Sequence, residues 1–307
     1  MTTYASALAA AHDAAASQHY PKSALYLVAT PIGNLADISL RALHVLQLAD
    51  TIACEDTRHT QALLRAYGID RPGTRLLALH QHNESEASLQ VIARLREGQR
   101  VAYVSDAGTP AISDPGARLV AALAAESLQS IPIPGPSSVT AALSVAGLDI
   151  SGGDRFVFAG FLSSRSTERA TQIEALASEP RALVLLEAPH RIEALAGALA
   201  VLGARRLTVA RELTKQFEQV VTLAAADFPG WLAADANHAR GEFVLVLHPQ
   251  ATATDAGDEM RVLQLLLGEL PLKTAVKLAV EITGASRNQL YDAALALRSR
   301  QDDAPGA

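Results

Sequence analysis

The stretch Val101–Gly116, VAYVSDAGTPAISDPG, organises the chain because a short apolar segment passes directly into a polar loop. The apolar, β-branched start predicts a buried parallel strand, and the Ser, Asp, Gly and Pro residues after it predict a loop. In an open α/β sheet, ligands bind beyond the carboxyl ends of the strands, where Gly108 and Gly116 would let backbone groups approach a ligand. Asp106 and Asp114 would add carboxylates, so we favour a ligand site. The alternative is an ordinary turn in which Asp114 caps the following helix.

The first half of the chain repeats this pattern of strand, polar loop and helix. Short apolar segments predict strands at Leu25–Ala29, Thr51–Cys54, Leu76–Leu79, Val101–Val104 and Ser130–Ile133. Segments with helical spacing follow at Asp37–Leu48, Thr60–Tyr67, Ser85–Glu97, Arg118–Glu126 and Val139–Val145. Strands that alternate with helices indicate a mainly parallel sheet, so five polar strand ends are expected to meet at one edge.

After Gly147 the pattern changes, and Ser151–Asp154 is the expected boundary between two domains. Further strands are predicted at Arg155–Ala159, Ala182–Leu186, Arg206–Ala210, Glu218–Thr222 and Phe243–Leu247, with helices at Thr167–Ala177 and Ile192–Leu202. Strands that are close in sequence favour some antiparallel pairing in this half. A polar linker is expected at Thr252–Asp258. Met260–Leu297 predicts two or three short helices broken at Gly268–Pro271 and Gly284, either an interaction module or a cap on the second domain.

These segments predict an α/β protein with a defined order of parts. We expect a flexible tail or weak helix at 1–22, an N-terminal α/β domain at 23–147, a C-terminal α/β domain at 148–250 and a helical module at 258–300. The chain has 307 residues, of which 49% are hydrophobic and 19% charged, and this composition suits a globular protein with two domains.

Composition also bears on location and partners. Residues 1–22 lack the features of a secretory signal, and no uninterrupted apolar run is long enough for a membrane span. The single cysteine, Cys54, fits a reducing cytoplasm. A net charge of −6 gives no general support to nucleic-acid binding, although a local basic face is compatible with it.

Several common motifs are missing from the sequence. No Gly-x-Gly-x-x-Gly follows a strand, and neither a Gly-Lys-Ser/Thr phosphate loop nor a Gly-x-Ser-x-Gly elbow is present. Dinucleotide, ATP and serine-hydrolase readings therefore lack their fingerprints. His80, His82 and Glu84 could suggest a metal site, but an ordinary polar loop explains them better, so no metal is expected.

Charged residues gather at the predicted strand ends. They comprise the carboxylates Glu55, Asp56, Asp106, Glu187 and Glu212 and the cations Arg58, Arg191, Arg211 and Lys215. Each also has a structural alternative: Asp56 or Thr57 as a helix cap, Arg58 and Arg191 in surface ion pairs, and Glu212 paired with Arg211. Their recurrence at successive strand ends favours an active cleft between two α/β domains.

Six phrases in order carry a family resemblance that spans roughly residues 24–300. They are ATPIGNLADISLRAL (Ala29–Leu43), EDTRHT (Glu55–Thr60), SDAGTPAISDPG (Ser105–Gly116), PGPSS (Pro134–Ser138), EAPHRI (Glu187–Ile192) and RELTK (Arg211–Lys215). The chain thereby resembles the ribosomal small subunit methyltransferase I group of the tetrapyrrole methylases, the class III methyltransferases that use S-adenosylmethionine.

The resemblance implies two α/β domains of the tetrapyrrole methylase type with S-adenosylmethionine in the cleft between them, a C-terminal helical module, and usually a homodimer. It implies 2′-O-methylation of a cytidine in the decoding centre of 16S rRNA, within the 30S subunit, in the cytoplasm. The nearest alternative is a C-methyltransferase acting on a precorrin or uroporphyrinogen. A second alternative is a ribosome-binding protein that keeps the cofactor pocket without turnover, and a nicotinamide oxidoreductase is disfavoured because the glycine fingerprint is missing.

The resemblance also assigns residues. Cofactor contacts are expected from Pro31, Asp106, Ala107, Gly108, Thr109, Ile112, Ser137, Ser138, Glu187 and Leu213. The Gly241–Phe243 turn is expected beside the adenine. Leu186 departs from the family pattern, in which an aromatic residue is expected, so a ring contact is missing or replaced here.

The chemistry requires the acceptor oxygen, the methyl carbon and the sulfur to lie in line, and it requires a base for the hydroxyl proton. Asp106, Glu55 and Asp56 are the candidate bases. Arg58, Arg191 and Lys215 are the candidate contacts to RNA phosphates.

Overall fold

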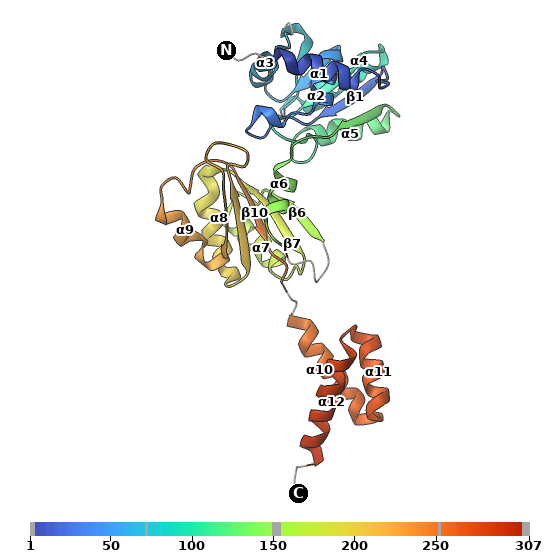
Figure 1. Cartoon of the computed structure of the whole chain (residues 1–307), viewed down its shortest axis with the longest axis vertical. Coiled ribbons are helices and arrows are strands. Elements are labelled where there is room, and N and C mark those ends of the chain that lie inside the picture. Colours follow the sequence, from blue (N-terminus) through green and yellow to red (C-terminus); the bar gives the residue numbers. More distant parts are fainter. Residues whose placement is uncertain (1–3, 71–72, 81, 149–154, 251–252, 303–307) are drawn as a thin grey trace. The chain divides into compact units, whose positions relative to one another are not determined.

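The computed structural model describes residues 4–70, 73–80, 82–148, 155–250 and 253–302 (Figure 1). The chain divides into two compact units, one of residues 1–173 with 182–248 and one of residues 174–181 with 249–307. The first unit contains two five-stranded sheets. The expected boundary Ser151–Asp154 lies outside the described residues, so the division of the first unit into two domains stays a prediction.

The first sheet is entirely parallel, which confirms the prediction of a mainly parallel sheet. Its strands are β1 (Ala24–Val28), β2 (Thr51–Cys54), β3 (Leu76–Ala78), β4 (Val101–Val104) and β5 (Gln129–Ile133). They lie in the order β3-β2-β4-β1-β5. All four residues of β4 are buried, which explains the unbroken apolar run in the sequence. Because the strands are parallel, their carboxyl ends share one edge, where the loops after β2 and β4 become neighbours.

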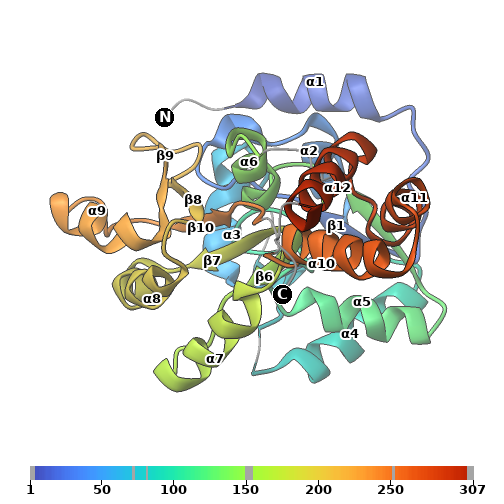
Figure 2. The same cartoon turned by 90° about the horizontal axis from the view of Figure 1, so that it is seen from below.

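Helices cover both faces of this sheet. They are α1 (Ala5–Ala15), α2 (Leu40–Leu48), α3 (Thr57–Ala66), α4 (Glu84–Arg96) and α5 (Gly116–Ala125), with short 3-10 turns η1 (Leu35–Asp37) and η2 (Gly73–Arg75). The helix after β5, α6 (Ser138–Val145), instead packs on the second sheet. Tyr26 and Ile52 belong to one core with α1, α2 and α3, whereas Leu25 and Tyr103 belong to another with α4 and α5, which lie side by side in Figure 2. For the N-terminal residues, predicted as a tail or a weak helix, the structure has a helix whose Ala11 is fully buried.

The second sheet is mixed, which confirms the antiparallel pairing expected in this half. Its strands are β6 (Phe156–Gly160), β7 (Ala182–Glu187), β8 (Arg206–Arg211), β9 (Gln219–Ala224) and β10 (Phe243–Leu247). They lie in the order β6-β7-β10-β8-β9, and only the β6–β7 pair is parallel. The last strand in the sequence, β10, is therefore the central one, and all five of its residues are buried.

The helices of this half are α7 (Ser166–Ala177), α8 (Ile192–Leu199) and α9 (Phe228–Ala234), with the turns η4 (Pro189–Arg191), η5 (Ala200–Leu202) and η6 (Ala225–Asp227). Helix α6 packs on β10, and Ala142 and Val244 belong to one apolar cluster. Ile32, from the loop after β1, packs against the same cluster. This contact fixes a loop of the first sheet against the second sheet.

The second unit contains α10 (Ala253–Glu269), α11 (Leu272–Thr283) and α12 (Arg287–Asp302). These helices share a small core around Leu263, Val276 and Leu290. The breaks predicted at Gly268–Pro271 and Gly284 are confirmed, but the predicted linker Thr252–Asp258 is wrong for residues 253–258, which form the start of α10. Among the described residues, no helix combines the length and apolar character that crossing a membrane requires.

Candidate active site

Loops of both sheets line a cavity of about 310 Å³. The first sheet and its connections contribute Ile32, Glu55, Ser105, Asp106, Ala107, Gly108, Thr109, Ile112, Ser113, Asp114, Ser137, Ser138 and Val139. The second contributes Phe161, Leu186, Glu187, Ala188, Ala210, Leu213, Glu242, Phe243 and Val244. In the part of the chain that the structure describes, no lysine or arginine lines this cavity.

Glu55 lies at the end of β2, in the wall of the cavity. Burial, followed by the negative charges of Asp114 and Asp106, raises the pKa of this carboxyl to about 7. Its Oε1 atom is buried and has no hydrogen-bond partner among the described residues. Glu55 can therefore take up or release a proton close to neutral pH, and its free oxygen can accept a hydrogen bond from a ligand.

Asp56, the neighbouring acid, lies outside the cavity lining and begins α3. Its carboxylate accepts hydrogen bonds from the backbone N–H groups of Arg58 at 2.7 Å and His59 at 3.3 Å. These two bonds lower the pKa of Asp56. The structural alternative for Asp56, a helix cap, is therefore confirmed.

The loop after β4 is held rigidly. Thr30 and Gly108 exchange two backbone hydrogen bonds of 3.0 Å, which tie this loop to the loop after β1. The Asp114 carboxylate accepts from the backbone N–H of Ala111 at 2.7 Å and of Gly116 at 2.8 Å, and from the Tyr103 hydroxyl at 2.9 Å. Only glycine fits at position 116, because a Cβ there would lie 2.2 Å from the Tyr103 ring.

Ala111 has a φ of 65°, a left-handed conformation that is rare for residues other than glycine. Glu212 and Thr214, in the loop after β8, have positive φ values of 53° and 65°. Such strained backbone persists only where the surrounding contacts hold it, and it concentrates at functional sites. Here each of the three strained residues is the sequence neighbour of a residue that lines the cavity, either Ile112 or Leu213.

Glu187, at the end of β7, has a fully buried side chain. Its Oε1 atom accepts a hydrogen bond from the backbone N–H of Ala188 at 2.9 Å and lies 3.0 Å from Arg191 Nε. Its Oε2 atom is buried without a partner among the described residues. Arg191 also donates a short hydrogen bond to the Leu162 carbonyl, so this guanidinium is committed to an ion pair and a loop.

Lys215 joins two acids of the second half. Its Nζ atom lies 2.7 Å from Glu212 Oε1 and 3.1 Å from Glu242 Oε2. Burial by itself would raise the pKa of Glu212, but hydrogen bonds from Lys215 and from the Glu242 backbone outweigh it and lower the pKa. Gly241 makes room for this arrangement, because a Cβ there would lie 2.3 Å from Glu212 Cγ.

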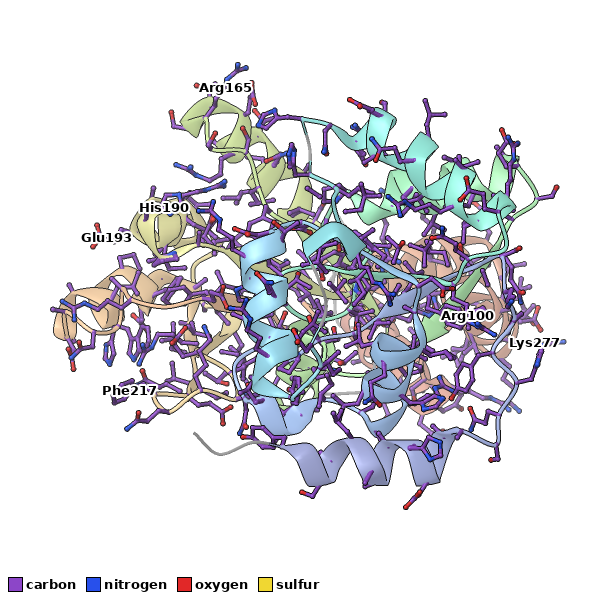
Figure 3. The ribbon with its side chains drawn as sticks, turned by 90° about the horizontal axis from the view of Figure 1, so that it is seen from above. Arg100, Arg165, His190, Glu193, Phe217 and Lys277 are labelled. Carbon is purple, nitrogen blue, oxygen red and sulfur yellow. The ribbon has the colours of Figure 1, made fainter. Side chains whose placement is uncertain are left out.

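The ion-pair partner of Glu212 is thus Lys215, and the pair with Arg211 that was the structural alternative for Glu212 is not formed. Arg211 is buried and donates to the Arg240 carbonyl at 3.1 Å and the Phe217 carbonyl at 3.3 Å. Phe217 itself is 69% exposed at the edge of the molecule (Figure 3). Arg211 therefore braces two loops instead of neutralising an acid.

The structure brings together most, but not all, of the predicted residues. In the cavity lining are Glu55, Asp106, Ala107, Gly108, Thr109, Ile112, Ser137, Ser138, Glu187 and Leu213. Outside the lining are Pro31, Asp56, Arg58, Arg191 and Lys215. Arg58 has a 94% exposed side chain, 3.9 Å from Asp56 at its closest.

Sequence reasoning assigned no role to Phe161, Val139 or Ala210, which also line the cavity. Phe161 directly follows a strand, and residues beyond the ends of strands often line ligand sites, so its position in the sequence could have indicated a role. Leu186, noted as a departure from the family pattern, lies in the lining as well. Among the described residues, no group of three or more His, Cys, Asp or Glu could hold a metal ion.

Two family models match the sequence. The model described as Tetrapyrrole (Corrin/Porphyrin) Methylases matches residues 24–228, and the one described as RsmI C-terminal HTH domain matches residues 253–298. The chain is 47% identical to Ribosomal RNA small subunit methyltransferase I of Pseudomonas aeruginosa, over 88% of this chain and 96% of that protein. It is 43% identical to the protein of the same name from Neisseria meningitidis, over 94% and 99% of the two chains.

Solved structures share the fold of the two sheets. A structure of diphthine synthase has a TM-score of 0.58 at 19% identity and covers 75% of this chain and 91% of its own. A cobalt precorrin-4 methyltransferase has a TM-score of 0.53 at 20% identity, covering 73% and 94%. Both likenesses support the fold alone.

Proposed function

The chain belongs to the ribosomal RNA small subunit methyltransferase I family within the tetrapyrrole methylases, and we propose that it methylates the 2′ hydroxyl of a cytidine in the decoding centre of 16S rRNA. The observation that carries the chemistry is Glu55, a carboxyl with a pKa of about 7 and an unpartnered oxygen in the wall of the cavity. A base with this pKa suits the removal of a hydroxyl proton at neutral pH.

We propose S-adenosylmethionine as the cofactor, and the cavity residues fit it. This molecule carries positive charge and has hydroxyl and amine donors, whereas the cavity wall offers carboxylates and no lysine or arginine among the described residues. The unpartnered oxygens of Glu55 and Glu187 lack the donors that a buried carboxylate needs. When bound, the cofactor supplies a methyl group already activated on sulfur.

The residues proposed to hold the cofactor are Pro31, Asp106, Ala107, Gly108, Thr109, Ile112, Ser137, Ser138, Glu187 and Leu213. All but Pro31 line the cavity, and Pro31 precedes Ile32, which does. The braced loop after β4 supports this assignment, because a rigid wall fixes a ligand with little loss of conformational entropy on binding.

Of the three candidate bases, the geometry supports Glu55 best. Asp56 is occupied as a helix cap, with its pKa lowered by the two backbone hydrogen bonds. Asp106 is exposed and lines the cavity, so it is the second choice and a candidate for contact with the cofactor's positive charge. In this proposal Glu55 accepts the proton of the ribose hydroxyl while the loops align that oxygen with the methyl group.

Of the three cations proposed to contact RNA phosphates, Arg58 is the best supported, because its side chain is 94% exposed. Arg191 and Lys215 are held by carboxylates, so they would first have to release those partners.

The homodimer, the cytoplasmic location and the 30S subunit as the substrate particle complete the proposal, and each follows from the family alone. The helical module at 258–300 is proposed as a separate part of the enzyme.

Methyl transfer from labelled S-adenosylmethionine tests this function. Unmodified 30S subunits, free 16S rRNA and uroporphyrinogen are offered side by side, and the labelled nucleotide is identified after digestion. We expect label on a cytidine ribose. Label on the tetrapyrrole alone would overturn the substrate, and tight binding to subunits with no transfer would favour a ribosome-binding protein without turnover.

A further inference from the structure

A half-exposed aromatic ring lies in the wall of the cavity, where β6 ends. Phe161 is 52% exposed although it lines the cavity. Ile112, from the loop after β4, also lines it and is 56% exposed. The two loops are neighbours, since a Cβ added at Gly160 would lie 4.0 Å from Ser113 Oγ. A large apolar surface that the fold leaves open beside a ligand cavity indicates a binding surface.

The backbone before Phe161 is shaped to direct its side chain. The β6–β7 register shifts between Phe158 and Gly160, and Gly160 has a φ of 65°. A register shift re-aims the side chains that follow it, as β-bulges do beside active sites. Without the shift, strict alternation along the strand would set the direction in which Phe161 projects.

The loop that follows Phe161 is held from behind. Arg191 donates to the Leu162 carbonyl, and the buried Arg169 donates to the carbonyls of Ser163 and Ser164, each at 3.4 Å. The Ser163 N–H donates to Gln172 Oε1 at 2.8 Å. Arg165, labelled in Figure 3, marks the far end of this loop. These hydrogen bonds hold the loop backbone, while Phe161 itself stays about half exposed.

We infer that Phe161 is a stacking platform for the base of the acceptor nucleotide. A flat, open ring suits a planar base, because proteins hold unpaired RNA bases by stacking them on aromatic side chains. Phe243 also lines the cavity but is 2% exposed, so Phe161 is the aromatic residue of the lining whose surface is open to a base. Phe161 would also supply the ring that is missing at Leu186. This inference rests on the proposed function and adds to it the residue that positions the base beside Glu55.

The test compares Phe161→Leu, which keeps apolar volume but removes the ring, with Phe161→Tyr, which keeps the ring. Phe156→Leu is the matched control, because Phe156 begins the same strand, is 46% exposed and does not line the cavity. The measurements are kcat/KM for unmodified 30S subunits, the Kd for S-adenosylmethionine, and binding of the subunits without cofactor.

We expect Phe161→Leu to lower kcat/KM and subunit binding by roughly tenfold to a hundredfold, the contribution of one stacked base. The Kd for the cofactor should stay unchanged in Phe161→Leu. Phe161→Tyr should keep most of the kcat/KM and subunit binding because it keeps the ring, and Phe156→Leu should leave all three measurements unchanged. Unchanged kcat/KM in Phe161→Leu would overturn the inference and leave the proposed function intact. If Phe161→Leu loses cofactor binding by the same factor as kcat/KM, the ring contacts the cofactor. If the oligomeric state of the variant changes, the ring contributes to a contact between two copies of the protein. Either outcome would overturn the inference.

A failure of the proposed function gives a different result. If the wild-type protein transfers no methyl group to RNA, the function fails whatever Phe161 does. Binding of the 30S subunit then still tests the inference, because removing the ring of a stacking platform should weaken that binding. Equal binding by the wild type and Phe161→Leu would overturn it.

Discussion

The carboxylates in and beside the cavity wall have opposite environments in the two halves of the site. In the first half, Glu55, Asp106 and Asp114 lie near one another, and no cation among the described residues forms a salt bridge with any of them. In the second half, Glu187 pairs with Arg191, and Lys215 pairs with both Glu212 and Glu242. The pKa of Glu55 is raised accordingly, whereas that of Glu212 is lowered.

The difference separates two tasks that one residue type performs. An acid with a paired cation holds neighbouring loops in place, and its charge is already balanced. An acid left without a cation makes the fold less stable when it ionises, but it keeps a proton affinity and a binding capacity for a ligand. We therefore assign proton transfer to the acids of the first half and the positioning of loops to the ion pairs of the second, and the following predictions test that assignment.

The largest effect is expected from Glu55→Gln. Gln keeps the size of the side chain but cannot accept the proton, so the methyl-transfer rate should fall by about 10²–10⁴-fold. Single-turnover methylation of unmodified 30S subunits measures it. A full rate in this variant would transfer the role of base to Asp106.

Thermal unfolding of Glu55→Gln tests whether the negative charge of Glu55 destabilises the fold. The folded pKa of Glu55, about 7, exceeds the ordinary value of 4.5, so its protonated form favours folding. That contribution is complete below pH 4.5 and is lost as the pH rises through 7. At about pH 8, Glu55→Gln should therefore raise the Tm, whereas Glu212→Gln, the control from the paired half, should lower it.

The next largest effect is expected from Arg191→Met. Removing this guanidinium leaves Glu187 charged and fully buried, so the free energy of unfolding should fall by about 2–4 kcal/mol. Urea denaturation measures it. The double variant Glu187→Gln/Arg191→Met should recover part of the loss, because it removes the unpaired charge. If the double variant is no more stable than the single one, the ion pair is not what stabilises this wall.

A smaller effect is expected from pH alone. Because the base must be ionised, kcat/KM of the wild type should rise about tenfold per pH unit up to about pH 7 and then level off. Rates measured across this range on stable 30S subunits provide the test. A flat profile would contradict a base with the raised pKa of Glu55.

The smallest effect is expected from Asp56→Ala. Loss of the cap on α3 should lower the free energy of unfolding by about 1 kcal/mol, with the methyl-transfer rate nearly unchanged. Asp56→Asn, which still caps, is the matched control, and urea denaturation measures both variants. Loss of activity in a stably folded Asp56→Asn would return this residue to the chemistry.

Local patterns in the sequence predicted most elements of the fold. Thr51–Cys54, Val101–Val104 and Phe243–Leu247 were predicted with the ends that the structure has, because turn residues bound each apolar run. Helix α9 was missed because Pro229 and Gly230 lie inside it, and burial of Phe228 overrides their low helical propensity. The strand order was not predictable, since it depends on pairing between segments far apart in the sequence.

The site was predictable as a collection of residues, but their roles were not. Glu55 and Asp56 are neighbouring acids, and only the start of α3 determines that one faces the cavity while the other caps the helix. Lys215 was expected to be free for RNA, but Glu242, 27 residues away, folds back onto it. The direction of the Phe161 side chain depends on a register shift in β6, which simple alternation along a strand does not reveal.

The position of β10 determines when the cavity can form during synthesis. This strand lies between β7 and β8, yet its residues, 243–247, emerge from the ribosome after every other strand of the sheet. Until then β7 and β8 have no partner on their facing sides, and such open edges can pair with other chains. The cavity wall at Phe243 and Val244 is then also missing. The growing chain can thus complete its first sheet early, but it acquires a closed binding site only when this last strand inserts.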